Sequence, residues 1–182
     1  MIPQEVLVRA GAEAAKDFTD HYYRCLNEER LVANLYVTNN STYTQAGHPP
    51  ADICINGLVV STPEQWDEMV KSQRPVGPPE PPATRASLVQ YHPDSLDCHV
   101  INSDYRYAAP PEVLVPNPSK PHQGASVRTM LLVTVSGRVT FGAAPELHFN
   151  DVFRLVPNWD AIAKHAKGSK RFLITSHTYR AF

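Results

Sequence analysis

The sequence predicts an α+β domain in which helices pack on one face of an antiparallel sheet. Helical periodicity is confined to residues 4–72, and the segments after the first proline-rich stretch have the pattern of strands. The 182 residues, of which 42% are hydrophobic and 19% charged, suit one domain with a substantial core. We therefore expect a single domain over residues 1–182.

Three helices are predicted in the N-terminal part. The first covers about residues 4–26, where apolar side chains recur every four residues opposite a charged face. The second covers residues 27–36, with Asn27 as its cap and two acids in its first turn. The third begins at Ser61-Thr62-Pro63-Glu64, a hydroxyl cap followed by proline, and ends before residues 74–75.

Strands are predicted where β-branched and aromatic residues run between turn signals. Gly57 marks a bulge or a turn, and Gly137 a bend in the longest strand. That strand is apolar on both faces around residues 130–133, whereas three helices cover only one side of a sheet. The other side therefore needs a partner or a ligand. The predicted strands are residues 41–44, 53–60, 95–101, 127–141, 147–156 and 172–182.

Ten of the 17 prolines lie in two stretches, and both predict exposed loops within one domain. The first loop covers about residues 74–83. The second is a long insertion over about residues 105–124, and its length is typical of a functional loop. Its apolar residues could hold it against the sheet or a partner: Tyr105, Tyr107, Val113 and Leu114.

Charge and cysteine content narrow the function classes. A net charge of −1 does not indicate a strongly electrostatic binder of nucleic acid or membranes. No apolar run approaches the roughly 20 residues that span a bilayer, and residues 1–5 lack the features of a signal peptide. Three widely spaced cysteines indicate buried thiols in a reducing compartment. Because phosphate loops, dinucleotide fingerprints, nucleophile elbows and zinc-ligand spacings are missing from the sequence, we expect no cofactor or metal.

Three ordered segments resemble a known family. The first is Phe18–Tyr23 followed by Leu31 and Leu35-Tyr36, and the second is Val135–Phe141 followed by Phe149–Phe153. The third is Ile174–Arg180. Together they resemble the nuclear transport factor 2-like family, and within it the small subunit of the heterodimeric mRNA export receptor. The length of the 105–124 insertion is similar to that of a fungal-type member.

The resemblance implies a fold and a function. The fold is a cone: a strongly curved, antiparallel-rich mixed sheet with three helices on its concave face. The function is that of a non-catalytic adaptor, which heterodimerises through its sheet with the large subunit of the receptor. We expect it in the nucleus and at the nuclear pore, shuttling to the cytoplasm. It would meet FG-repeat proteins mainly as the heterodimer, touch RNA weakly or indirectly, and bind no membrane.

The resemblance also implies that Arg180 pairs with an acidic residue of the large subunit. Nearby aromatic residues supply the contact area that interfaces use as anchors. Some of them must instead fill the core, because strand residues alternate between faces. The sequence does not determine which ones, because it does not fix the strand register. For His177 the simpler interpretation is a hydrogen-bonded sheet histidine. The candidate partner-binding residues besides Arg180 are Tyr179, Phe182, His177, Phe153 and Phe149.

Other functions remain open from the sequence. The same fold houses dehydratases and isomerases, for which Asp97, His99 and His148 would be bases and Tyr22, Tyr23 and Tyr43 donors. None of these residues forms a pair at motif spacing. A carrier that homodimerises is a third possibility. One basic cluster, either a solvated turn or an auxiliary RNA contact, consists of Lys164, Lys167, Lys170 and Arg171.

Overall fold

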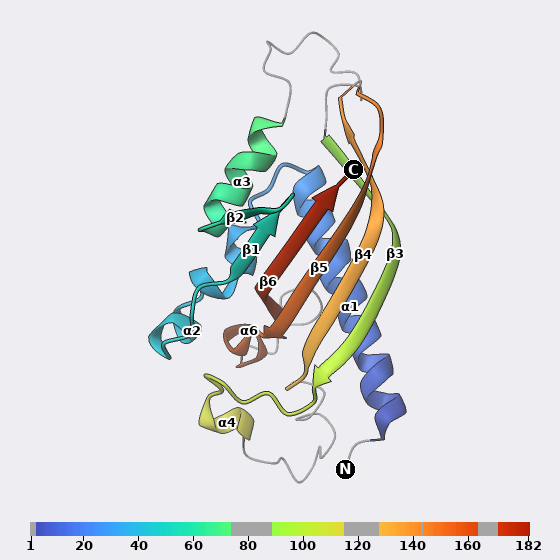
Figure 1. Cartoon of the computed structure of the whole chain (residues 1–182). Helices are drawn as coiled ribbons and strands as arrows, with labels where there is room; N and C mark the ends of the chain where they lie inside the picture. The colour runs from blue at the N-terminus through green and yellow to red at the C-terminus, as the bar shows by residue number, and fades with distance from the viewer. Residues whose placement is uncertain (1–2, 74–88, 115–127, 143, 164–170) are drawn as a thin grey trace.

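A six-stranded sheet with the order β2-β1-β6-β5-β4-β3 is the centre of the computed structural model, which describes residues 3–73, 89–114, 128–142, 144–163 and 171–182. β1 pairs with β6 in parallel and the other neighbours are antiparallel, so the sheet is mixed. It is open, not closed into a barrel (Figure 1). The α+β prediction is confirmed. The strands are β1 Asp52–Ile55, β2 Leu58–Val60, β3 Val89–Asn102, β4 Met130–Phe141, β5 Leu147–Pro157 and β6 Phe172–Ala181.

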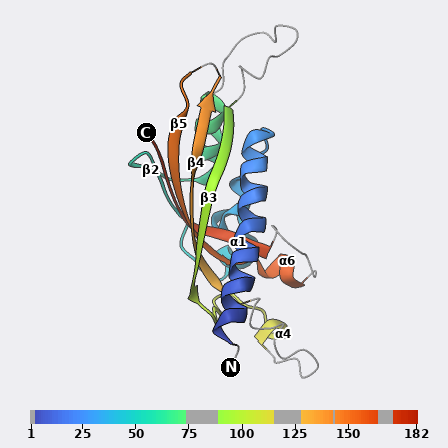
Figure 2. The ribbon, with the colours of Figure 1, turned by 90° about the vertical axis from the view of Figure 1, so that its right-hand side faces the viewer.

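The predicted first helix is confirmed as α1, Gln4–Asn27, which lies across one face of the sheet (Figure 2). Gly11 brings the helix close to the strands. A Cβ atom there would lie 3.0 Å from Val100 Cγ2 and 3.4 Å from Leu131 Cδ2. Further along the helix, the buried rings of Phe18 and Tyr22 pack on Phe153 of β5. The packing of α1 on the sheet therefore depends on a small residue against β3 and β4 near one end and on aromatic rings against β5 further along.

The predicted third helix is also confirmed, as α3, Pro63–Ser72. Thr62 and Gln65 form a capping box at its start, with Pro63 in the first turn. Its Asp67 carboxylate accepts hydrogen bonds from the backbone N–H groups of Val32 and Ala33 at 2.9 and 3.1 Å. The chain after α1 is thereby tied to α3. The other α-helices in the described ranges are α2 Ser41–Gln45, α4 Pro111–Leu114 and α6 Trp159–Ala163.

Two predicted elements are wrong, and both errors involve an asparagine. Residues 27–36 are not a second helix, because α1 runs through Asn27 and a 3-10 turn follows at Ala33–Leu35. The Asn27 side chain instead makes two hydrogen bonds to the backbone of Tyr91 in β3, at 3.0 and 2.8 Å. Residues 41–44 are not a strand but part of α2, which is capped by Asn40.

Residues 53–60 form two strands, not one. Asn56 and Gly57 have φ angles of 50° and 84°, the conformation of a two-residue hairpin turn. The interpretation of Gly57 as a turn is therefore confirmed. Asn56 also ties the turn to β6, because its N–H donates to the Tyr179 carbonyl and its side chain accepts from the Ala181 N–H.

The proline-rich loops are described only in part. Residues 74–83 and 115–124 lie outside the described residues. At the start of the insertion, the Tyr105 ring stacks on Trp159, whose indole N–H donates to the Tyr107 carbonyl at 2.8 Å. The Tyr107 hydroxyl donates to the Ala46 carbonyl. These contacts hold the start of the insertion against α6 and the end of α2.

Gly137 lies where β3 and β4 lose their regular register. The pairing shifts between Pro93 and Ser95, opposite Gly137 and Ser136. A Cβ atom at Gly137 would lie 2.4 Å from the His92 carbonyl oxygen and 2.8 Å from the Phe149 ring. Only glycine at residue 137 therefore lets β4 pass this close to the Phe149 ring and to the β3 backbone at the bulge.

We expect Gly137→Ala to lower the free energy of unfolding by about 2–4 kcal/mol, because a backbone atom cannot move aside cheaply. Urea denaturation followed by circular dichroism measures this change. Thr140→Ala, on the same strand with a half-buried side chain, is the control and should cost about 1 kcal/mol or less. Equal stabilities of the two variants would contradict the close packing.

Candidate functional site

Strand register divides the sheet into two different faces. Residues that pair directly across strands share a face, and most of one such set is buried beneath the helices. Residues of the other set are exposed or half-buried, and Figure 2 shows no described helix over them. We call this second surface the open face. It includes Asp52, Cys54, Val59, Ser176, Thr178, Arg180, His148, Asn150, Val152, Arg154, Leu132, Thr134, Ser136, Arg138, His92, Asp97 and His99.

The middle of the open face is uncharged. One row crosses the sheet from Val59 through Cys54, Thr178 and Val152 to Thr134. Val59 is 82% exposed, and the other four side chains are half-buried. The sequence predicted that β4 is apolar on both faces, and on this face the prediction holds only in part. Leu132 is apolar, but the next residues of β4 on the open face are Thr134, Ser136 and Arg138. Such a mixed surface is typical of an interface between separately folded proteins.

Arg180 lies on the open face, as its predicted role requires. It pairs across the ladder with Asn150 of β5, and its side chain is exposed. Among the described residues it makes no ion pair. Phe182, just beyond β6, is 74% exposed, and its backbone exchanges two hydrogen bonds with His148. Both side chains are free to contact another molecule.

The other four candidate aromatic and histidine residues lie on the opposite face. They are almost fully buried against α1 and α3, so we correct their assignment to a partner surface. The physical reason is the alternation of strand residues, which sends Arg180 and Asn150 outward and their neighbours inward. The four exposed fractions are 1% for Phe149, 0% for Phe153, 0% for His177 and 2% for Tyr179.

A polar cluster that the sequence analysis missed lies in the core around Asp151, which is 1% exposed. The Tyr23 hydroxyl donates to Asp151 Oδ2 at 2.9 Å. His177 Nε2 lies 2.8 Å from Asp151 Oδ1, off the line of a hydrogen bond. His177 Nδ1 is 2.7 Å from the Tyr36 hydroxyl. Asp151 lies two residues after Phe149 and two before Phe153, so strand alternation places it on the same face as these aromatic residues. This spacing is the sequence signal that could have revealed a buried acid.

Burial raises the pKa of the tyrosines in this cluster well above its ordinary value. For Tyr23 the neighbouring charge of Asp151 raises the pKa further. For Tyr36 burial is the main cause, and a hydrogen bond from Tyr22 opposes it. The indole of Trp66 donates to Tyr22 at 2.9 Å. These phenols stay protonated at neutral pH, so the cluster links α1, α3, β5 and β6 through hydrogen bonds.

The candidate catalytic residues are spread over several places, although Asp97 and His99 form an exposed pair at 3.1 Å. Asp97, His99 and His148 are exposed on the open face, on β3 and β5. The Tyr43 hydroxyl donates to the Pro157 carbonyl at the far end of the core. No cluster of three or more potential metal ligands occurs within the described ranges. Nor is any described helix both long and apolar enough to cross a bilayer.

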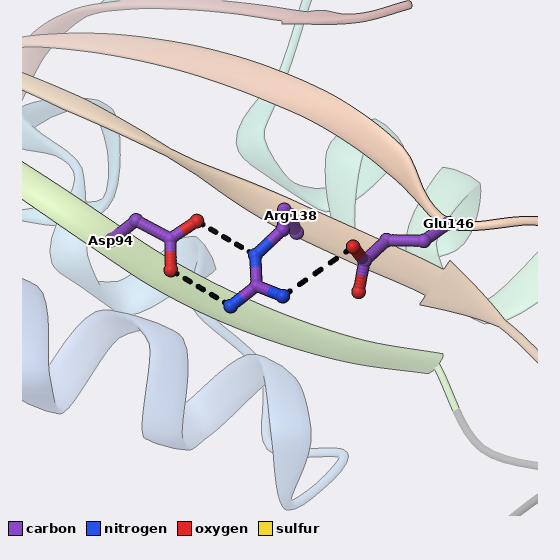
Figure 3. Close-up of polar contacts among 3 residues, drawn as sticks. All are labelled: Asp94, Arg138 and Glu146. Carbon is purple, nitrogen blue, oxygen red and sulfur yellow. Dashed lines mark hydrogen bonds and ion pairs between the residues drawn. The ribbon is translucent and has the colours of Figure 1, made fainter.

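Arg138 is already neutralised within the chain. Its guanidinium holds Asp94 of the β3 bulge in a fork at 2.8 and 2.9 Å and reaches Glu146 at 3.4 Å (Figure 3). These hydrogen bonds hold the pKa of Asp94 below its ordinary value. Because the three side chains are partly exposed, the contribution to stability is small. The fork holds the bulge in place and leaves no free charge on Arg138.

Lys164, Lys167 and Lys170 of the predicted basic cluster lie outside the described residues. Arg171 is described and half-buried, and its carbonyl accepts from the Asn158 N–H at 2.7 Å. An RNA contact at this cluster therefore stays a prediction.

The comparisons with solved structures identify the fold. Nuclear transport factor 2 from Cryptosporidium parvum matches with a TM-score of 0.52 at 17% identity, over 94% of each chain. This distant likeness concerns the fold alone. The open sheet, with its helices on one face, is the nuclear transport factor 2-like fold, as expected from the sequence. The chain matches no family model and no curated protein.

Much closer matches identify the family. A chain in the complex of the Mex67 NTF2-like domain with Mtr2, from Chaetomium thermophilum, is 49% identical over 95% of this chain and 99% of that one, with a TM-score of 0.81. A structure of Mtr2 is 48% identical over the same shares, also with a TM-score of 0.81. The structure of a Sac3N peptide bound to Mex67:Mtr2 matches at 48% identity over 93% and 98% of the two chains, with a TM-score of 0.79. The chain belongs to the Mtr2 family.

We expect Asp151→Ala to lower the free energy of unfolding by about 3–5 kcal/mol, because it leaves the Tyr23 hydroxyl buried without its acceptor and the His177 ring without the carboxylate beside it. Equilibrium unfolding in urea measures the change, and Asp151→Asn should cost less since it keeps an acceptor oxygen. Asp97→Ala, which removes an exposed carboxylate on β3, is the control. A loss of less than about 1 kcal/mol for Asp151→Ala would show that the cluster contributes little.

Proposed function

We propose that this chain is the non-catalytic small subunit of an mRNA export receptor, bound through its open face to the NTF2-like domain of a Mex67-type large subunit. One observation carries the proposal: the chain is 48–49% identical, over nearly its whole length, to Mtr2, which has been solved in complex with Mex67. The open face supplies a surface for such a partner. Its uncharged middle and exposed arginines suit a polar interface with another folded domain.

The role we propose is that of an adaptor. The Asp151 cluster is enclosed by side chains of the core, so it gives no specific support to an enzyme. We place the heterodimer in the nucleus and at the nuclear pore, where it would meet FG-repeat proteins. RNA contacts would come mainly from the large subunit. These assignments extend the sequence-based expectations and rest on the family relationship.

Co-expression with the NTF2-like domain of the large subunit from the same organism tests the proposal. We expect a 1:1 complex in size-exclusion chromatography with light scattering, and higher solubility than for the chain alone. Failure of the two purified chains to associate would refute the heterodimer. A stable homodimer with no affinity for the large subunit would instead favour the homodimeric carrier.

Arg180→Glu should weaken this complex by about 100-fold or more, because reversal of an interface charge leaves its acidic partner unpaired and facing a like charge. The isolated domain should stay folded. Isothermal titration calorimetry measures the affinity, and thermal melting checks the fold. Arg24→Glu is the matched control, since Arg24 is an exposed arginine of α1 on the helix side. Equal affinities of the two variants would remove Arg180 from the interface.

A further inference from the structure

A second arginine on the open face has the same properties as Arg180. Arg154 of β5 is exposed, and it makes no ion pair within the part of the chain that the structure describes. The third arginine of this face, Arg138, differs because Asp94 and Glu146 already neutralise it. Arg154 and Arg180 therefore present two uncompensated positive charges on neighbouring central strands.

The ladder fixes the separation of these two charges. Arg154 pairs with Ser176, and Ser176 precedes Arg180 by four residues on β6. At about 3.3 Å of rise per residue, the two backbone positions are separated by about 13 Å along the strand direction, on the same face. Thr178 and Val152, a directly paired couple, lie between them. The centre of the face is therefore an uncharged patch with an arginine at each end.

A bulge on β6 lies directly beside Arg154. The β5–β6 register shifts between Arg154 and Leu155, so that Thr175 is the extra residue on β6. The Thr175 hydroxyl donates to the Arg154 carbonyl at 3.2 Å. This hydrogen bond ties the Arg154 backbone to β6 at the bulge, where the regular ladder is interrupted.

Charges at the two sides of the face have the opposite sign. Asp52 lies on β1, and Asp97, next to His99, lies on β3. If two copies of this chain stacked centre to centre, the arginines of their central strands would meet one another. Like charges in such positions oppose association. The pattern fits a different partner, whose central strands are acidic.

We propose that Arg154 is a second charged anchor of the partner-binding face, and that the partner's facing sheet presents two carboxylates about 13 Å apart, one for each arginine. The inference rests on the proposed heterodimer and adds the chemistry of the partner surface. One ion pair allows a stacked sheet to turn about it, whereas two fix the crossing angle. Arg154 is therefore a residue that selects the partner and its orientation.

Calorimetric titration of the purified large-subunit NTF2-like domain into variants of this chain tests the inference. Arg154→Glu should weaken binding by about 10–100-fold, and Arg154→Gln by less, with a smaller dependence on salt than the wild type shows. Arg9→Glu, an exposed arginine of α1 on the helix side, is the matched control and should bind as the wild type does. Thermal melting of each free variant confirms that it is folded.

Charge reversal on the partner identifies the second carboxylate. Each exposed Asp and Glu of the large-subunit domain is changed singly to Lys and titrated with Arg154→Glu and with Arg180→Glu. We expect one reversal to restore binding by Arg154→Glu, and a different one by Arg180→Glu. The inference is overturned if Arg154→Glu binds within twofold of the wild type, or if one reversal rescues both variants. Absence of wild-type binding would instead refute the heterodimer itself.

Discussion

The carboxylate of Asp151, buried at the centre of the molecule, sets conditions that the surrounding elements must meet. A carboxylate that is 1% exposed is costly unless other groups compensate it. Tyr23 from α1 and His177 from β6 do so directly, and Tyr36 completes the contacts of the histidine. Helix α1, the turn after it and the last strand therefore meet at Asp151 through these contacts. The cluster therefore adds specificity to an aromatic core that could otherwise pack in several ways.

The same strands that carry this cluster also carry the open face, because successive residues point to opposite sides. On β5, Asn150 and Val152 point away from the helices, whereas Asp151 and Phe153 point toward them. A substitution on the inner side changes stability, and one on the outer side changes recognition. The register of β5 against β6 is what keeps these two properties separate.

Sequence periodicity was sufficient for α1, α3 and the long strands, since each carries a strong local pattern. It failed at Asn27, whose side chain hydrogen-bonds to the backbone of Tyr91, 64 residues away. It also failed at Asn40, which caps α2 by accepting from the Tyr43 N–H, because the composition of residues 41–44 is typical of a strand. Strand propensity placed Arg180 in a terminal strand, which the structure confirms, and the family resemblance gave that residue its expected role. The resemblance could not show that Arg180 lies on the open face whereas Tyr179 and His177 are buried on the other one. The face of each residue depends on the strand register, which is set by pairing with strands that are distant in sequence. Asp151 and Arg154 were missed for the same reason.

The order of the strands has a consequence for how the chain folds. β6 lies between β1 and β5 in the sheet, although β1 comes from residues 52–55 and β6 from residues 172–181. During synthesis the hairpin of β1 and β2 emerges long before the strand that joins it to the rest of the sheet. Until then Trp66 of α3 lacks its contacts with the rings of His177 and Tyr179. Completion of the sheet therefore waits on contacts between distant parts of the chain, a topology that favours slow folding and keeps apolar surface exposed for longer.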